Sequence, residues 1–298
     1  MPKIKYRNIK LNATSLGLVD VCNRIIEDYQ SQGFRLTLRQ LYYQLVSRDI
    51  IPNRQTEYKR IGSIVNDARL AGLIDWDAIE DRTRNIRTLA HWNHPEEIMN
   101  AVAEQYREDI WADQDWRPEV WIEKDALVGV IEGVCNEFDV PFFSCRGYTS
   151  QSEMWGGSVR LLQWAKRRQV PMIFHLGDHD PSGKDMTRDI QDRMALFMGG
   201  IKLERLALNM DQVRLYNPPP NPAKTTDSRY AGYIAEFGEE SWELDALEPK
   251  VIADLIRAAI TALINQKKWR AHQGKVEGER RVLEAVATHW TEIEERYS

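Results

Sequence analysis

The chain has 298 residues, with 40 lysines and arginines against 45 acidic residues and a formal net charge of −5. Hydrophobic residues make up 43% and charged residues 29%, an ordinary globular composition that excludes a disordered, collagen-like or coiled-coil chain. No apolar run approaches the roughly 18 residues that a membrane span needs, and three cysteines without a CxxC pair predict neither a disulfide framework nor a structural zinc site. Residues 1–10 carry no apolar signal segment, so we expect a cytoplasmic protein of two domains without membrane contact.

Charge is distributed unevenly along the chain. Residues 1–74 hold 12 lysines and arginines against 6 acidic residues, a local net charge of +6 that leaves −11 for the remainder. A basic head on an acidic body favours an anionic partner such as double-stranded DNA, because a local basic patch is enough to attract phosphates. Charge also varies this much between the domains of proteins that bind no nucleic acid, so the asymmetry alone leaves the question open.

The first 74 residues predict three helices. Apolar residues recur at helical spacing from Ser15 to Gln30. A second helix is expected after Thr37, which can cap it, and it ends in the turn at residues 49–53. A third is expected after Thr56 and stops at Gly72. Helix, tight turn, helix is the skeleton of a helix-turn-helix or winged-helix domain.

Cations gather on or beside the third predicted helix. A helix that enters a DNA groove needs cations there, whereas an ordinary three-helix bundle would simply present them to solvent. The first interpretation predicts DNA contacts for Arg54, Lys59, Arg60 and Arg69.

Beyond the head, strands alternate with helices. A helix from Pro95 to Trp111 lies in a connector, and a charged helical extension covers residues 266–296. Alternation of this kind is typical of βαβ units on a parallel sheet, so we expect an α/β fold with domains at 1–88, 89–117 and 118–298. Strands are expected at 120–122, 140–143, 170–176 and 201–208, and helices at 126–138, 152–168 and 182–198.

Three carboxylates fall at the ends of two of these strands. Glu123 follows the first strand, and Asp178 and Asp180 follow the third. Because parallel strands lie about 4.8 Å apart and ligands gather at their carboxyl ends, the three side chains are expected to meet at one point. Mutually repelling carboxylates coexist most easily around a hard cation, so the pattern predicts Mg²⁺ or Mn²⁺ acting on a phosphodiester.

The residues around these aspartates support the same interpretation. Gly177 and Gly183 allow close backbone approach, and Ser182 can cap the following helix, whose N-terminus favours anions. His179, between the aspartates, either contacts phosphate or faces solvent.

A glutamate at a strand end followed by an Asp-x-Asp-x-x-Gly motif resembles the Toprim domain. Segments 123–126 (Glu-Lys-Asp-Ala), 146–150 (Arg-Gly-Tyr-Thr-Ser) and 178–183 (Asp-His-Asp-Pro-Ser-Gly) follow the order of motifs in the topoisomerase VI A subunit and the related meiotic double-strand-break protein. Segments 242–247 and 39–43 resemble two further motifs of that family. The chain is similar to reduced virus- or prophage-associated (phage) members, and the resemblance implies an N-terminal winged-helix domain followed by a Toprim domain with a mainly parallel sheet and a C-terminal helical extension.

The resemblance also implies roles for individual residues. Tyr43 corresponds to the nucleophile, and Arg39, four residues earlier on the same helix face, supports it. Tyr42 points about 100° away and is expected in the core. Arg146 is expected to contact DNA. The metal ligands are Glu123, Asp178 and Asp180, with Glu123 counted among the catalytic residues as well.

Three functions remain open from the sequence. The first is a magnesium-dependent DNA-cleaving enzyme related to topoisomerases (an isomerase) that works as a homodimer. The second is a hydrolytic nuclease in which metal-activated water replaces Tyr43, and the third is a non-catalytic DNA-binding regulator. The sequence contains no Walker-type GxxxxGKS motif, so strand passage would need an ATPase B-type subunit as partner.

Overall fold

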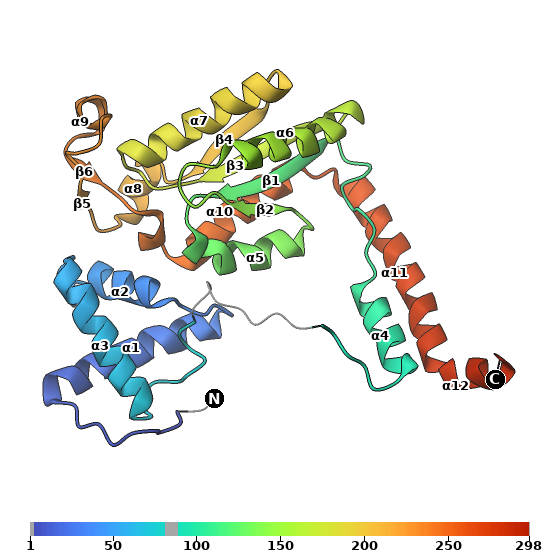
Figure 1. Cartoon of the computed structure of the whole chain (residues 1–298), viewed down its shortest axis with the longest axis horizontal. Helices are drawn as coiled ribbons and strands as arrows, with labels where there is room; N and C mark the ends of the chain where they lie inside the picture. The colour runs from blue at the N-terminus through green and yellow to red at the C-terminus, as the bar shows by residue number, and fades with distance from the viewer. Residues whose placement is uncertain (1–2, 81–88, 298) are drawn as a thin grey trace.

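A computed structural model describes residues 3–80 and 89–297 (Figure 1). The head contains the three expected helices around a core of its own. Thr37 and Gln40 form a capping box at the start of the second helix, as the sequence indicates. The third begins at Gln55, two residues earlier than expected, and its N-cap Arg54 makes no side-chain hydrogen bond. These helices are α1 (Ala13–Ser31), α2 (Leu38–Ser47) and α3 (Gln55–Leu70).

A winged-helix domain carries a β-hairpin wing beside its helices. Within residues 3–80, strand pairing is limited to one isolated parallel bridge between Leu36 and Ile79. The predicted end of this domain, residues 81–88, lies outside the described residues. The head therefore has the three expected helices, and a winged-helix domain stays a prediction.

The body is built on a four-stranded sheet in the order β2-β1-β3-β4, and every pairing is parallel. This confirms the α/β class with a parallel sheet. The third strand matches its predicted bounds, whereas the second begins two residues late and extends to Ser144. The strands are β1 (Trp116–Ile122), β2 (Phe142–Ser144), β3 (Val170–Leu176) and β4 (Lys202–Ala207).

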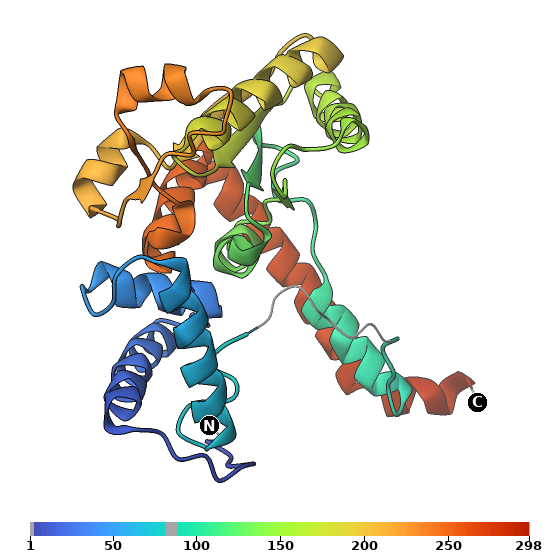
Figure 2. The same cartoon turned by 60° about the vertical axis from the view of Figure 1, so that its left-hand side comes forward.

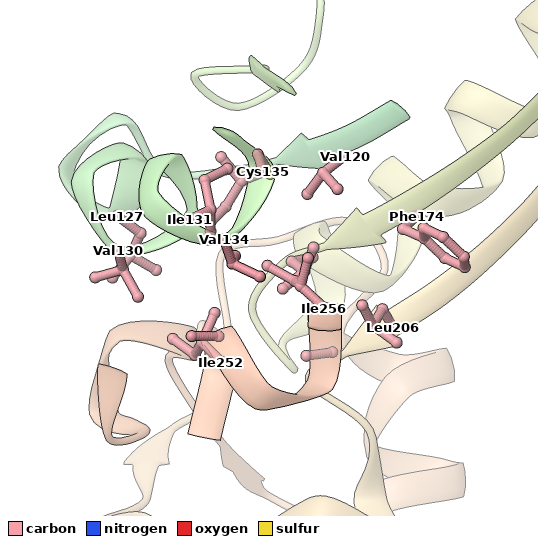
Figure 3. Packing of buried hydrophobic residues seen from close by; sticks show 14 of the residues in the cluster. Val120, Leu127, Val130, Ile131, Val134, Cys135, Phe174, Leu206, Ile252 and Ile256 are labelled. Carbon is pink, nitrogen blue, oxygen red and sulfur yellow. The ribbon is translucent and has the colours of Figure 1, made fainter. Parts of the chain in front are cut away.

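Helices cover both faces of this sheet (Figure 1). Strand residues pack alternately, so Val120 and Phe174 face α5 and α10 while Trp121 and Ile173 face α6 and α7. Figure 3 shows the first of these interfaces, where Ile256 of α10 approaches the strands. The helices are α5 (Val128–Glu137), α6 (Gln151–Lys166), α7 (Pro181–Met198), α8 (Met210–Tyr216), α9 (Tyr230–Phe237) and α10 (Pro249–Leu263). Short elements are η1 (Asp125–Leu127), η2 (Leu244–Ala246), β5 (Asn221–Pro222) and β6 (Glu240–Ser241).

A helical arm projects from the body (Figures 1 and 2). It pairs α4 (Pro95–Gln105), shorter than predicted, with α11 (Gln266–Thr288), and α12 (Trp290–Tyr297) follows. The Tyr106 hydroxyl donates to Glu279 at 2.7 Å and fixes the end of α4 to α11. In the described ranges, 3–80 and 89–297, no helix combines the length and apolarity of a membrane span.

The head meets the body through α2 and η2. Ala246 of η2 packs into the hydrophobic core of the head. Asn53, in the turn between α2 and α3, donates to Asn221 of β5 at 2.7 Å. These contacts place the helix that carries Tyr43 beside the segment that follows β6.

Candidate active site

The carboxyl ends of β1 and β3 bring the predicted metal ligands together. The backbone N–H of Glu123 donates to the Leu176 carbonyl at 2.8 Å, and its Oε2 accepts the Asp178 N–H at 2.9 Å. A Cβ at Gly177 would lie 2.9 Å from Glu123 Oε2, so a larger residue there would displace the Glu123 carboxylate. Asp180 is the N-cap of α7 and accepts the Gly183 N–H at 2.6 Å, a role that the sequence assigned wrongly to Ser182.

In each of the three carboxylates, one oxygen is held by hydrogen bonds. The other oxygen meets no hydrogen-bond donor in the described part of the chain. Asp178 Oδ1 accepts the Leu244 N–H at 2.8 Å, and Ser182 donates to Asp180 Oδ1 at 2.9 Å. Lys224 Nζ stays 3.9 Å from Asp180 Oδ2. The donor set therefore fits a hard divalent cation such as Mg²⁺. Across residues 3–80 and 89–297, no three acidic, histidine or cysteine side chains form a compact metal site, so a metal ion at these strand ends stays a prediction that would require the carboxylates to move closer together.

Burial makes two of these carboxylates, Asp178 and Glu123, costly as anions. It raises the pKa of Asp178 to about 7, and the charges of Glu123 and Asp245 add to the effect while Lys124 opposes it. Burial likewise raises the pKa of Glu123, with a contribution from Asp180. The mutual repulsion that the sequence predicted is therefore present.

The ammonium group of Lys124 lies at the centre of a second group of carboxylates, which the sequence analysis missed. Its Nζ is 2.9 Å from Asp178 Oδ1, 2.8 Å from Glu243 Oε2 and 2.9 Å from Asp245 Oδ1. Burial alone would lower the pKa of Lys124, but the three carboxylates raise it well above its ordinary value. Two signals were available in the sequence: a lysine directly after Glu123 and two acids in the segment 242–247.

Arg39 and Tyr43 of α2 face the same carboxylates from the head. Arg39 Nε is 2.8 Å from Asp245 Oδ2, its guanidinium also pairs with Glu243, and it donates to the Tyr43 hydroxyl at 3.5 Å. Tyr43 is 4% exposed, and burial followed by the charges of Asp245 and Glu243 raises its pKa well above the ordinary value. The predicted pair is therefore formed, and the phenol stays protonated at neutral pH in this conformation.

Tyr42 packs in the core of the head, as predicted. Its ring lies 5.3 Å from that of Tyr43, and its hydroxyl accepts the Arg54 N–H at 2.8 Å. It thereby ties the start of α3 to α2.

Arg205 of β4 supports the aspartate loop from beneath, and the sequence analysis also missed it. Its guanidinium donates to the carbonyls of Gly177 at 2.9 Å, Asp178 at 2.5 Å and Gly183 at 2.9 Å. Burial lowers its pKa to about 10, partly offset by Glu123, Asp178 and Asp180, so it remains charged at neutral pH. One partly buried cation therefore fixes the backbone that carries two of the three predicted ligands.

His179 neither faces solvent nor is placed to contact phosphate, so both alternatives drawn from the sequence are wrong. It is fully buried, its Nδ1 is hydrogen-bonded to the Tyr233 hydroxyl at 2.8 Å, and its backbone pairs with Trp242. Its ring packs against Phe237. The residue between the aspartates thus anchors their loop to the 230–242 segment.

The predicted DNA-contacting cations differ in their surroundings. Arg54 and Lys59 are exposed on the head, whereas Arg60 pairs with Glu57 at 2.6 Å and Arg146 with Asp125 at 3.2 Å. Arg69 donates to the Trp76 and Ile79 carbonyls and stacks over the Trp76 ring, so its guanidinium holds the fold of the head and is not free for the predicted phosphate contact.

His175 of β3 gives the stability of the body a dependence on pH. It is fully buried, hydrogen-bonds Thr187 at 2.9 Å, and has a pKa lowered to about 3 by burial and by the charge of Arg205. The folded state keeps the imidazole neutral, while the unfolded chain takes up a proton near pH 6.5. Stability is therefore lost as pH falls from about 6.5 towards 3, by about 2 kcal/mol between pH 7 and pH 5.

Urea unfolding at pH 7 and pH 5 checks this, with His175→Gln as the comparison because glutamine can keep a hydrogen bond to Thr187. The native chain should lose about 2 kcal/mol more than the variant over this interval. Equal losses in the two proteins would show that His175 does not carry the pH dependence.

Comparison with known proteins assigns this chain to no family. No protein-family model matches the sequence, and no curated protein matches it either.

Proposed function

We propose that this chain cleaves DNA strands in a metal-dependent reaction in which Tyr43 is the nucleophile, as the resemblance to the topoisomerase VI A subunit implies. The observation that carries the proposal is a continuous set of ion pairs. Arg39, beside Tyr43, binds Glu243 and Asp245, and both acids bind Lys124, which contacts Asp178. An ordinary structural core has little use for this many charges around two buried aspartates, Asp178 and Asp245, whereas a site for phosphoryl transfer needs them.

The chemistry follows from these groups. Glu123, Asp178 and Asp180 would hold Mg²⁺ or Mn²⁺, which when bound polarises a phosphodiester. The Tyr43 oxygen attacks phosphorus, the P–O3′ bond breaks, and the products are a 5′-phosphotyrosyl link and a free 3′ hydroxyl. The phenol releases its proton to solvent, and the departing oxygen takes one up. Arg39 donates to the Tyr43 oxygen and lowers the cost of its negative charge.

Hydrolysis is the second candidate, and the burial of Tyr43 favours it. The phenol is 4% exposed and Arg39 is occupied by two carboxylates, so the head must shift before Tyr43 reaches a DNA strand. A water molecule at the carboxylates needs no such movement. A homodimer, an ATPase partner and a topoisomerase role stay predictions.

Cleavage of supercoiled plasmid with magnesium or manganese separates the candidates. We expect the native chain to leave protein-linked ends after SDS treatment, and Tyr43→Phe to lose them at least about 1000-fold because the nucleophile is gone. Tyr297→Phe, at an exposed tyrosine of α12, is the matched control and should cleave normally.

The two contrary results are distinct. Free ends that survive Tyr43→Phe but vanish in Asp178→Ala would replace transesterification by hydrolysis. Absence of any metal-dependent cleavage in folded native protein would remove both candidates and leave a DNA-binding protein.

A further inference from the structure

Residues 3–10, called the basic segment below, form an irregular stretch of chain that is held against the end of α3. The backbone N–H groups of Tyr6 and Arg7 both donate to the Leu70 carbonyl at 2.9 Å. A Cβ at Gly72, whose φ is +74°, would lie 2.9 Å from the backbone of the segment, so glycine permits this close crossing. Both views place the segment at the end of the head that lies away from the body (Figures 1 and 2). It is therefore separate from the candidate active site.

The basic segment carries four cations and no acidic residue. Lys3, Lys5, Arg7 and Lys10 are all exposed, and none of them forms an ion pair with the residues that the structure describes. Their one hydrogen bond within those residues runs from Lys5 to Asn8 Oδ1 at 3.2 Å. The negative end of α3 favours cations nearby, but backbone N–H groups already satisfy its last carbonyl. The charge of these side chains therefore has no full explanation within the fold of the head.

An exposed aromatic pair lies beside these cations. The Tyr6 side chain is 65% exposed, and its ring centroid is 5.3 Å from that of Trp76 at an angle of 85°. The Trp76 ring is itself held, because its Nε1 donates to the Ile4 carbonyl at 3.0 Å and the Arg69 guanidinium lies 4.7 Å from its centroid. Tyr6 thus presents a ring whose position is fixed by its neighbours, so little side-chain entropy is lost when a ligand covers it.

Cations beside an exposed ring match one chemical class of partner. Phosphates satisfy the cations, and a base satisfies the ring by stacking on it, which is how unpaired nucleic-acid strands are bound. A duplex offers the phosphates alone, because its bases are already stacked on one another. An acidic peptide likewise leaves Tyr6 uncovered. Asp77, next to Trp76 in the sequence, is exposed and lowers the local charge, but four cations outweigh one carboxylate.

We propose that the basic segment binds an unpaired nucleic-acid strand, with its four cations at the phosphates and Tyr6 stacked on a base. DNA and RNA share this chemistry, and the experiment below includes both. The proposal does not rest on the function proposed above, because the segment lies away from the carboxylates and needs no metal. If the chain also cleaves DNA, the segment directs it to substrates that carry an unpaired stretch.

Binding of fluorescein-labelled oligothymidylate and oligouridylate to the full chain, followed by anisotropy in EDTA, tests the stacking. Tyr6→Leu keeps an apolar contact with Trp76 but removes the ring, so it should weaken binding about tenfold. The same substitution at the 87% exposed Tyr297 of α12 is the matched control and should change affinity less than about twofold. The strand that binds the native chain more tightly identifies the source.

The salt dependence of binding tests the cations. Lys3→Gln combined with Lys10→Gln should reduce the slope of log K against log salt by about 1.4, since each phosphate contact of a single strand contributes about 0.7. Lys166→Gln combined with Lys202→Gln changes the net charge equally at exposed positions of the body and should leave the slope nearly unchanged. Because none of these four lysines forms an ion pair with the described residues, all variants should keep the native urea midpoint.

Three results would each overturn the proposal. Native affinity in Tyr6→Leu would remove the stacked base, and so would a thymidylate–adenylate duplex that competes as well as the unlabelled strand. Equal slopes in the two double lysine variants would mean that the whole charged surface binds the strand. Displacement by polyglutamate as readily as by the strand would point to an acidic protein partner. Failure of the plasmid assay does not affect these results, which need neither metal nor turnover.

Discussion

Replacing Lys124 by methionine is expected to destabilise the protein by about 3–5 kcal/mol, because it leaves several neighbouring carboxylates without the cation that they share. The Lys124 side chain is 18% exposed and contacts Asp178, Glu243 and Asp245, of which Asp245 is 1% exposed. Methionine fills a similar volume, so the loss reports charge and not a cavity. Urea unfolding at pH 7 measures it.

Compensation within the same group distinguishes a charge effect from a general defect. Asp245→Asn removes one of the uncompensated charges, so the double variant should be more stable than Lys124→Met alone. Lys268→Met is the matched control, since its exposed pair with Asp115 at 3.1 Å should be worth less than about 1 kcal/mol. Equal destabilisation by Lys124→Met and Lys268→Met would show that the buried ion pairs contribute nothing specific.

Local pattern was enough to predict much of the fold and part of the site. The apolar run at residues 170–176 is a strand because both faces of a parallel strand are buried, and the structure gives it those bounds. The carboxylates at 123, 178 and 180 could be placed together because strand ends of one parallel sheet meet at one edge. The core position of Tyr42 was predicted correctly from the turn of about 100° per helical residue, but Tyr43 is just as buried and belongs to the same core.

Contacts between distant segments could not be predicted in this way. Lys124 and Glu243 are 119 residues apart, and the sequence pattern around either residue does not predict a contact with the other. Arg205 looks like an ordinary outward cation on β4, yet it folds beneath the aspartate loop. Arg69 was predicted to contact DNA, but the turn after α3 places the Trp76 ring against its guanidinium. In each case the partner is chosen by tertiary structure, which periodicity does not encode.

Among substitutions that add a single methyl group, Gly183→Ala is expected to impair the site most. A Cβ at this position would collide with the Asp178 carbonyl oxygen and lie 3.0 Å from its carbonyl carbon, and both are backbone atoms that cannot rotate aside. The Asp178 backbone must therefore move, although its N–H is bonded to Glu123 and its carbonyl to Arg205. We expect a loss of about 1–3 kcal/mol in stability from the forced contact and at least about 100-fold in metal-dependent cleavage from the displaced ligands.

Gly156→Ala provides the comparison, because a Cβ there has nothing within 4 Å and α6 should gain a little stability from alanine. Urea unfolding and plasmid cleavage of both variants separate two explanations. If Gly183→Ala lost stability but kept full cleavage, the exact placement of Asp178 would not matter to the reaction, and a metal site at these strand ends would lose its support. If it lost cleavage while remaining folded, as we expect, the close approach of α7 to the Asp178 backbone is what sets the ligands, and the glycine in the Asp-x-Asp-x-x-Gly motif is there for that contact.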